Sequence, residues 1–492
     1  MGTSQLPAAE SVWNAALYAI LLALAVTVWL SRTYSDRPIG VRARTDLPGP
    51  RVIPFLGNLL LVYPHRKRML MLMDELQETY GELFTFTMPG WGRNIVVNRP
   101  EWLEHIRKRD TQLYGKGPVE LAIFGEFPGE RSAFGSEGND WKLSRRIIQP
   151  IFTTKTFDEH VSQAMNGAMP LTVSLVESLA AHNATFDFNK LSGRLALMIF
   201  CKMALNNDLD LLSKTPEYLV ARNPLMDAVY TMNSISSSRL YNPFWRVTEK
   251  FDGTHTRFRT ARSEISKIID EIVQERRKLH SSGALECGKD FLSALLDNPS
   301  LEDDQKLLRD TLWLERMRNE CRSHEDVHLI QYKDLSKYPI HQAVFYETLR
   351  LWPGVPKNAR RALADDVLPA IPDQGFQEVM VAKGDYVLWS DFAMMRNEKV
   401  WGADAKEFNP GRHLNPEGQF VKPPYPKFHA FGMGPRLCPG AQLSAYEFVA
   451  IWVALLPRFD FIPVENIERK PMDAFTMSME GEFLVRAFKR ME

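Results

Sequence analysis

Phe428 to Phe448 reads FHAFGMGPRLCPGAQLSAYEF and decides how the rest of the sequence is interpreted. It places Cys438 on a glycine-rich turn ahead of an apolar, helix-like run, with Arg436 two residues earlier. A basic neighbour and the amide dipoles at the start of a helix both stabilise a thiolate, the form of cysteine that binds metals. We therefore predict that Cys438 is a metal ligand. The alternative is a single buried cysteine in an ordinary loop.

The spacing Phe431-x-x-Gly434-x-Arg436-x-Cys438-x-Gly440 resembles the heme-binding loop of the cytochrome P-450 family, the heme-thiolate monooxygenases. The resemblance implies heme b (iron protoporphyrin IX) as cofactor and Cys438 as the axial ligand of its iron. It also implies that Phe431 packs beside the sulfur and that Arg436 meets a heme propionate. Gly434 and Gly440 would let the backbone approach the porphyrin.

The composition is that of a globular protein without a dominant charge. Of its 492 residues, 45% are hydrophobic and 24% are charged, and 60 basic side chains balance 60 acidic ones. This balance predicts no nucleic-acid partner. The cysteines show neither the spacing of a zinc site nor that of a disulfide framework, so we expect the core to hold the fold, as in a reducing compartment. They are Cys201, Cys287, Cys321 and Cys438.

The amino terminus contains a candidate membrane anchor. Val12 to Leu30 reads VWNAALYAILLALAVTVWL, which is free of charge and just long enough to cross the hydrocarbon layer. Arginines follow it, so the positive-inside rule places the remainder in the cytosol. We predict a short lumenal segment at 1–11, an anchor at 12–30 in the endoplasmic reticulum membrane, and a basic, proline-rich hinge at 31–58. A cleaved signal peptide is the alternative, but a basic n-region and a small-residue cleavage site are missing.

The remainder, residues 59–492, is expected to form one domain that is mainly α with a small β-sheet region, as the resemblance implies. Helical spacing predicts a helix within Arg66–Tyr80, and alternation predicts two strands within Leu83–Asn98. Val379 to Trp389 is expected to form a hairpin that turns at Lys383–Asp385.

Trp141 and Arg145 stand four residues apart, so they share one face of a predicted helix. They resemble the family's W-x-x-x-R element, which implies that both side chains bind a heme propionate. The flanking basic residues point elsewhere and could form a docking patch for an acidic reductase, or simply a solvated charged face. These residues are Lys142, Arg146 and, from a later loop, Lys427.

Glu347 and Arg350 stand three residues apart on another predicted helix and resemble the family's E-x-x-R motif. The resemblance implies a buried ion pair that a later arginine, Arg412, joins and that holds the cysteine loop. Its surroundings match only in part, because Gly411 and His413 replace the family's usual glutamate and aromatic residue. Farther along, Trp352 to Arg360 resembles the family segment that passes beside the heme. The resemblance implies that Arg360 binds a heme propionate.

One element of the family pattern is missing. Leu307 to Trp313, LLRDTLW, continues directly as LERMRNECRSHED, and the chain contains no A/G-G-x-D/E-T-T/S signature. In the fungal and plant fatty-acid-hydroxylase-like branch that this chain resembles, a long helix with that signature separates the two stretches. The absent piece would be about 45 Å of helix. A wrongly spliced gene model, a degenerate protein and a heme protein with altered chemistry are the three explanations.

The resemblance implies a membrane-tethered monooxygenase that uses electrons from an NADPH cytochrome P-450 reductase. Its substrate would be lipophilic, either a fatty-chain compound or a secondary-metabolite intermediate such as a terpenoid or polyketide. The alternatives are a catalytically impaired heme-binding remnant and a heme isomerase or reductase that needs no reductase partner. The sequence offers no distal catalytic residue to name.

Overall fold

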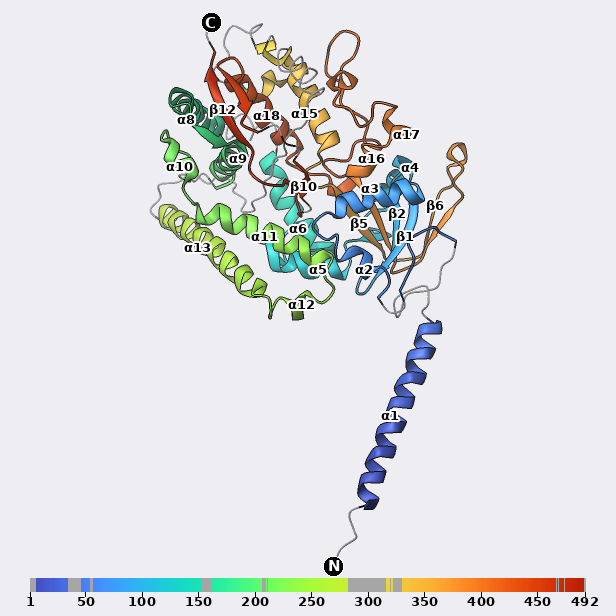
Figure 1. Ribbon diagram of the computed structural model, residues 1–492. Coiled ribbons are helices and arrows are strands. Elements are labelled where there is room, and N and C mark those ends of the chain that lie inside the picture. Colours follow the sequence, from blue (N-terminus) through green and yellow to red (C-terminus); the bar gives the residue numbers. More distant parts are fainter. Residues whose placement is uncertain are drawn as a thin grey trace, which may run out of the picture.

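The computed structural model shows a mainly helical body with small sheets and a separate N-terminal helix, as predicted (Figure 1). It describes residues 6–33, 46–53, 56–152, 161–205, 209, 211–281, 316–318, 320–321, 330–465, 467, 469–472 and 474–490. The helices of the first half are α1 (Leu6–Thr33), α2 (Leu59–Val62), α3 (Met69–Tyr80), α4 (Pro100–Arg109), α5 (Pro118–Phe124), α6 (Gly138–Ile148), α8 (Ser162–Ala181), α9 (Phe188–Leu205), α10 (Pro216–Val220), α11 (Pro224–Leu240), α12 (Trp245–Thr248) and α13 (Thr254–Ser281). Later helices are α15 (Pro339–Leu351), α16 (Asp391–Met394), α17 (Glu398–Trp401) and α18 (Ala441–Leu455).

Within the described residues, the strands form one five-stranded sheet and three smaller ones. The larger sheet has the order β1-β2-β8-β5-β3, from β1 (Leu83–Met88), β2 (Gly92–Val97), β3 (Tyr114–Gly115), β5 (Lys357–Ala362) and β8 (Tyr386–Ser390). A three-stranded sheet has the order β4-β12-β9, from β4 (Thr185–Asp187), β9 (Phe459–Pro463) and β12 (Leu484–Lys489). The remaining pairs are β6 (Asp366–Leu368) with β7 (Val379–Val381), and β10 (Pro471–Met472) with β11 (Ser478–Met479).

The five-stranded sheet and the larger helices occupy opposite sides of the body, and α18 and α6 lie between them (Figure 1). The sequence makes α18 apolar nearly all round, and it packs against both α8 and α15. Such a helix is expected in the core. Its place matters for function, because the cysteine loop leads directly into it.

Two sequence expectations are confirmed near the start of the body. The helix expected within Arg66–Tyr80 is α3, which buries Met69, Leu72 and Met73. The alternating stretch after it forms β1 and β2, paired antiparallel with Leu83 opposite Val97.

The predicted hairpin at Val379–Trp389 is wrong. Its first strand, β7, pairs with β6 in a separate two-stranded sheet, whereas β8 pairs with β2 and β5. Two adjacent alternating runs do not reveal whether they pair with each other, because distant strands compete for the same edges.

The second half of the predicted hinge belongs to the body. The backbone carbonyl of Pro48 accepts a hydrogen bond of 2.8 Å from the Thr85 amide in β1. Gly49 lies so close to this strand that a Cβ there would stand 2.1 Å from the Thr85 carbonyl oxygen. Asn58 closes the segment by donating to the Arg51 carbonyl at 3.0 Å. Residues 34–45 of the predicted hinge lie outside the described residues.

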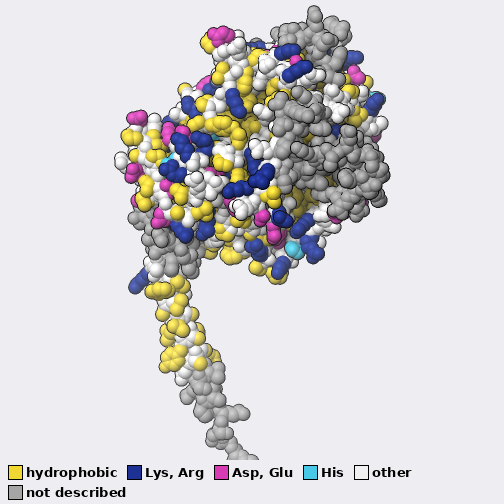
Figure 2. Space-filling model, turned by 180° about the vertical axis from the view of Figure 1, so that it is seen from behind, with side chains coloured by type: hydrophobic (Ala, Val, Ile, Leu, Met, Phe, Trp, Pro, Cys, Tyr) yellow, Lys and Arg dark blue, Asp and Glu magenta, His cyan; other side chains and the backbone are white. Residues whose placement is uncertain are grey.

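The predicted anchor is part of α1, which projects from the body (Figure 1). Its window Trp13–Leu30 has a mean hydropathy of 1.9, and none of it is buried against the rest of the chain. Figure 2 shows the described part of this helix largely covered by hydrophobic side chains, whereas basic and acidic side chains are interspersed over the visible face of the body. Length and composition therefore suit a membrane span.

Candidate active site

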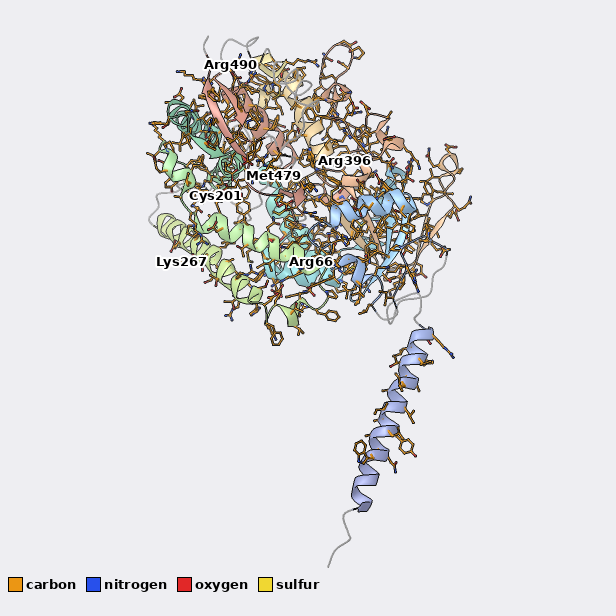
Figure 3. The ribbon with its side chains drawn as sticks, viewed as in Figure 1. Arg66, Cys201, Lys267, Arg396, Met479 and Arg490 are labelled. Carbon is orange, nitrogen blue, oxygen red and sulfur yellow. The ribbon has the colours of Figure 1, made fainter. Side chains whose placement is uncertain are left out.

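A cavity of about 930 Å³ opens inside the body between the large sheet and α18. Cys438 is on its wall, and its side chain is accessible although protein encloses it, because the sulfur opens into this cavity. The two other cysteines that the structure describes do not line it. Cys201, labelled in Figure 3, is buried on α9, where burial raises its pKa to about 12, and Cys321 is buried.

The loop that carries Cys438 is shaped by glycine and closed by its own backbone. Gly432 and Gly434 have φ of +71° and +61°, which residues with a Cβ rarely adopt. The amide of Cys438 then donates a hydrogen bond of 2.8 Å to the carbonyl of Phe431. This bond fixes the cysteine relative to Phe431, which lines the same cavity. Gly440 follows, and a Cβ there would stand 3.8 Å from the Cys438 sulfur.

The expected stabilisation of the thiolate by Arg436 is wrong. Burial raises the pKa of Cys438 above its ordinary value, and the Gly440 amide and the Arg145 guanidinium offset only part of that effect. Arg436 instead faces carboxylates: its Nε lies 3.2 Å from Oδ1 of Asp110, and its Nη2 lies 2.6 Å from Oε2 of Glu137. A metal bound here therefore has to displace the thiol proton.

Trp141 and Arg145 both line the cavity from α6, as their spacing predicts, but they have different neighbours. The Arg436 guanidinium carbon lies 4.7 Å from the centre of the Trp141 ring, which is a cation–π contact. Arg145 donates a hydrogen bond to the carbonyl of Leu437, the residue before the cysteine. In the described arrangement Arg145 thus holds the cysteine loop.

Arg360 reaches the cavity from β5 and shares Asp110 with Arg436. Its Nε lies 3.4 Å from Oδ2 of Asp110, and its guanidinium lies 5.7 Å from the ring of Trp389. One carboxylate thus stands between two guanidinium groups that were assigned separately from the sequence. Two cations beside one cavity would accept an acidic group of a ligand.

Four charged residues of this region were not predicted from the sequence. Asp110 and Glu137 are described above, and Lys116 and Glu120 line the cavity. Lys116 donates to the carbonyls of Ala133 and Ser136, and burial lowers its pKa to about 8, with a further contribution from Arg436. Burial raises the pKa of Glu120 to about 8. They stand in no recognisable motif, so the sequence carries no signal for them.

The residues present fit a heme. Among the described groups, Nη1 of Arg436 is a buried donor without a hydrogen-bond partner, beside the cavity that Arg436 lines. Buried donors are nearly always satisfied, so such a group indicates an acceptor that enters from the cavity. A propionate suits this position, and the Cys438 sulfur on the same cavity suits the iron. The chemistry of the donors therefore matches both ends of the cofactor.

A second cluster is built around Glu347, which does not line the cavity. Glu347 and Arg350 are both fully buried on α15 and form two hydrogen bonds of 2.8 Å. Nε of Arg412 lies 3.1 Å from Oε1 of Glu347, and Nε2 of His413 lies 3.0 Å from its Oε2. Burial alone would raise the pKa of Glu347, but Arg350 and His413 bring it down to about 2.

His413, where the sequence departs from the family, takes part in this buried cluster. His413 replaces an aromatic residue and is buried, with its ring 6.3 Å from that of Tyr346. Burial lowers the pKa of His413, although the hydrogen bond with Glu347 opposes this. The side chain thus fills an aromatic position and adds a hydrogen bond to the cluster.

Known proteins match this arrangement over most of the chain. The sequence model of the family described as Cytochrome P450 matches residues 47–315 and 307–485. The chain belongs to the cytochrome P450 family. Members of this family bind heme, so the fit of the cavity to that cofactor has an independent basis in the sequence.

This P450 is similar to proteins from a fungus and from plants. It is 31% identical to cytochrome P450 monooxygenase cyp1 of Mycosarcoma maydis over 477 residues, which cover 88% of this chain and 72% of that protein. Cytochrome P450 94A2 of Vicia sativa is 27% identical over 502 residues, covering 94% of this chain and 95% of that protein. Cytochrome P450 94B3 of Arabidopsis thaliana is 27% identical over 478 residues, with coverages of 90% and 92%.

The junction at Leu307–Trp313, where the family's distal signature is missing, lies outside the described residues. The two matches to the family model meet there, since one ends at 315 and the other begins at 307. The alignment with the Vicia sativa protein is longer, at 502 positions, than the part of this chain that it covers. It therefore contains gaps on the side of this P450.

Proposed function

We propose that this P450 is a heme-thiolate monooxygenase that inserts one oxygen atom from dioxygen into a lipophilic substrate. The cofactor is heme b, and the electrons come from an NADPH cytochrome P-450 reductase. The substrate class is a fatty-chain compound or a secondary-metabolite intermediate such as a terpenoid or polyketide. One observation carries the proposal: the Cys438 thiol opens into a cavity that also exposes two arginines joined by one carboxylate.

When bound, the heme supplies an iron centre that binds and reduces dioxygen. Cys438 would be its protein ligand, and Arg436 and Arg360 would hold its acid groups. Arg145 fixes the cysteine loop through the Leu437 carbonyl, and Gly440 directs its amide toward the sulfur. An amide directed at a thiolate withdraws charge from it, so these groups would set how strongly the sulfur donates to the metal.

The cavity wall supports a lipophilic substrate. Much of its described lining is aromatic or aliphatic, with Phe86, Trp91 and Leu240 among the contributing side chains. Apolar groups transferred to such a wall are removed from water, which favours binding of hydrocarbon by about 25 cal/mol per Å² of buried surface. Polar side chains also contribute to the lining, on α9 and α18 as well as near the two arginines.

An exposed basic group supports the reductase as partner. Lys142 and Arg146 are exposed on α6, whereas Trp141 of the same helix lines the cavity, and Lys427 is exposed ahead of the cysteine loop. Exposed cations attract an acidic partner from a distance and increase the rate of association at low ionic strength. Electrons delivered to this side would arrive next to the loop that holds Cys438.

The membrane is the second proposed partner, in the endoplasmic reticulum, with α1 as a single span and the body in the cytosol. Apolar side chains are also exposed on the body: Phe244, Val247 and Phe251 are 52%, 59% and 86% exposed in and beside α12, and Leu60 of α2 is 57% exposed. Both helices lie on the side of the body that faces α1 (Figure 1). This side would rest on the bilayer surface.

The missing distal segment supports the alternative of a catalytically impaired remnant or a wrongly spliced gene model. Sequencing of full-length transcripts separates these cases, because a message with the missing codons identifies a splicing error. A consistent absence of those codons leaves a real protein with an altered distal wall.

The proposal is tested by expressing the chain as written and recording its ferrous carbon monoxide spectrum. A thiolate-type band shows that the chain binds heme through a cysteine. Reconstitution with the reductase and NADPH, followed by mass spectrometry of a supplied lipophilic compound, then tests oxygen insertion. A good thiolate-type spectrum without any oxygenated product would overturn the monooxygenase proposal and favour the remnant.

A further inference from the structure

His429 stands at the start of the loop that carries Cys438, and its ring faces the carboxyl group of Asp391. The side chains of His429 and Asp391 are 1% and 0% exposed, and neither of them lines the cavity. Nδ1 of His429 lies 3.8 Å from Oδ1 of Asp391. In the part of the chain that the structure describes, neither atom has a hydrogen-bond partner. Two unsatisfied buried atoms thus stand opposite each other, although buried polar atoms are nearly always paired.

The other contacts of these two side chains determine where their hydrogen atoms lie. Nε2 of His429 lies 2.9 Å from the carbonyl oxygen of Pro426. A carbonyl only accepts hydrogen bonds, so Nε2 carries the ring hydrogen and Nδ1 of the neutral imidazole is an acceptor. Oδ2 of Asp391 accepts a hydrogen bond of 2.8 Å from the side-chain amide of Asn358. The remaining oxygen, Oδ1, faces the acceptor Nδ1, so with a neutral ring the two atoms attract each other only when Oδ1 carries a proton.

Burial disfavours the charged form of both groups. It raises the pKa of Asp391 well above its ordinary value and lowers the pKa of His429 to about 4. The groups that oppose this effect come from β5, from β8 and from the turn before His429, and they are Asn358, Trp389 and the carbonyls of Tyr425 and Pro426. Among the described residues, no charged side chain contributes to either pKa. A protonated carboxyl beside a neutral imidazole is therefore favoured over an ion pair.

The two side chains belong to parts of the chain with different degrees of regular structure. Asp391 is the first residue of α16, directly after β8 of the large sheet. Residues 414–433, which include His429, contain no helix and no strand longer than an isolated bridge. The carbonyl of His429 accepts a hydrogen bond of 2.7 Å from Gly432, and the carbonyl of Phe431 accepts one of 2.8 Å from Cys438. A bond between the two side chains would thus fix this irregular segment, and with it the cysteine, to the sheet.

We propose that the protonated carboxyl of Asp391 donates a hydrogen bond to Nδ1 of His429, and that this bond positions the loop that carries Cys438. Side-chain rotation that shortens the 3.8 Å separation by roughly 1 Å completes the bond. Asp391 and His429 are positioning residues, since they act on the cofactor site through the loop. The positioning role rests on the proposed function of Cys438 as heme ligand, whereas the hydrogen bond does not depend on it.

Asp391→Asn tests the proton, because an amide can donate to His429 and accept from Asn358 without one. The carboxyl of Asp391 is ionised above pH 5 in the unfolded chain and protonated in the folded chain, so folding of the wild type takes up a proton that the variant does not need. The unfolding equilibrium constant of the wild type should therefore rise relative to Asp391→Asn by about tenfold per pH unit from pH 5 to 7. Urea denaturation of the full-length holoenzyme measures both constants. A ratio that does not change with pH overturns the proposal, and Asp373→Asn, at an exposed site, is the control.

Asp391→Leu tests the hydrogen bond, because leucine has a similar size and no donor. Its unfolding equilibrium constant should exceed that of Asp391→Asn by about 10- to 100-fold at the same pH, the usual effect of leaving a buried polar group unpaired. When His429→Phe is added to both variants, this difference should shrink, since the acceptor is gone. An undiminished difference overturns the proposal, because it assigns the effect to Asn358 alone. If the leucine variants do not fold, the pH comparison with Asp391→Asn decides by itself.

The positioning role is measured as the rate of heme transfer to excess apomyoglobin. Asp391→Leu and His429→Phe should each release heme about tenfold faster than Asp391→Asn, because the loop loses its bond to α16. Equal transfer rates in the three variants overturn the positioning role.

Failure of this inference is distinguishable from failure of the proposed function, because denaturation and heme transfer do not require turnover. Oxygenated product together with a pH-independent stability ratio removes the hydrogen bond and leaves the monooxygenase proposal intact. The expected pH dependence and heme transfer without any oxygenated product do the reverse.

Discussion

Asp110 and Arg436 form an ion pair with 3.2 Å between Oδ1 and Nε, and this pair joins the residue after α4 to the cysteine loop. The other oxygen of the same carboxylate lies 3.4 Å from Nε of Arg360. Asp110 is buried, so its charge is compensated by both arginines at once. It thereby fixes how the two guanidinium groups are presented to the cavity, which makes it a positioning residue for the cofactor site.

Asp110→Asn is expected to weaken heme retention by about tenfold, because a neutral amide leaves two buried cations without their shared anion. The measurement is the rate of heme transfer to excess apomyoglobin. The band position of the carbon monoxide complex should stay that of a thiolate, since Cys438 is untouched. Asp373→Asn, at an exposed site, is the matched control. An unchanged transfer rate in Asp110→Asn would contradict the assigned role.

Cys438→Ala is expected to abolish the thiolate-type carbon monoxide spectrum, because it removes the sulfur that opens into the cavity. Cys201→Ala is the control, since that thiol is buried on α9 and does not line the cavity. It should retain the spectrum and lose only about 1 kcal/mol of stability from a smaller side chain. A thiolate-type band that persists in Cys438→Ala would show that the ligand has been assigned incorrectly.

Glu347→Gln is expected to destabilise the fold by about 3 to 5 kcal/mol, because it leaves the buried cation of Arg350 without its carboxylate. Urea denaturation followed by tryptophan fluorescence measures the change. Glu417→Gln changes an exposed glutamate in the same way and should alter stability by less than about 0.5 kcal/mol. Equal stability of the two variants would mean that the buried ion pair does not stabilise the fold.

The stability of the protein should fall in acid over a defined range. The pKa of Glu347 is about 2 in the folded chain, against 4.5 for the ordinary carboxyl group. The unfolded chain therefore binds the extra proton first, and the contribution of Glu347 is complete above pH 4.5 and is lost as the pH falls toward 2. That contribution is on the order of 3 kcal/mol. Denaturation curves from pH 6 to 2 should show the loss, and Glu347→Gln should lack this part of the pH dependence.

Membrane association should depend on α1 and, more weakly, on α12. A chain without residues 1–33 is expected to keep part of its affinity for liposomes, because Phe244, Val247 and Phe251 remain exposed. Changing Val247 and Phe251 to aspartate in that shortened chain should lower the affinity by about tenfold or more, since burying each apolar side chain is worth roughly 1.5 to 3 kcal/mol. Liposome flotation measures the bound fraction. A matched change of Met380 and Val367 of the β6–β7 sheet to aspartate serves as control.

The sequence predicted the fold class and several elements because those depend on local pattern. The helical spacing of Met69, Leu72 and Met73 gives α3, and the alternation after Leu83 gives β1 and β2. The sequence was a poorer guide to which strands pair with each other. The turn at Lys383–Asp385 suggested a hairpin, but β5 and β2 occupy both edges of β8, and β7 finds β6 instead.

Within the cofactor site, the sequence motifs identified the residues in advance. They did not show which charged groups those residues would pair with. Arg436 was expected to act on the sulfur beside it in sequence, but it faces Asp110 and Glu137, and Arg145 is the guanidinium that acts on Cys438. Local sequence fixes which side chain is available. Its direction depends on which opposite charge the folded chain places within reach.

The sequence by itself determined the family, the metal-binding cysteine as a candidate and the apolar N-terminal helix, since spacing and hydropathy are properties of a short stretch. The tertiary structure alone decided that Asp110 joins two arginines, that His413 forms a hydrogen bond with Glu347, and that the Lys357 ammonium lies over the Tyr241 ring. These relationships join segments far apart along the chain. They arise when burial leaves a charge or a donor to be satisfied by whatever group packing brings next to it.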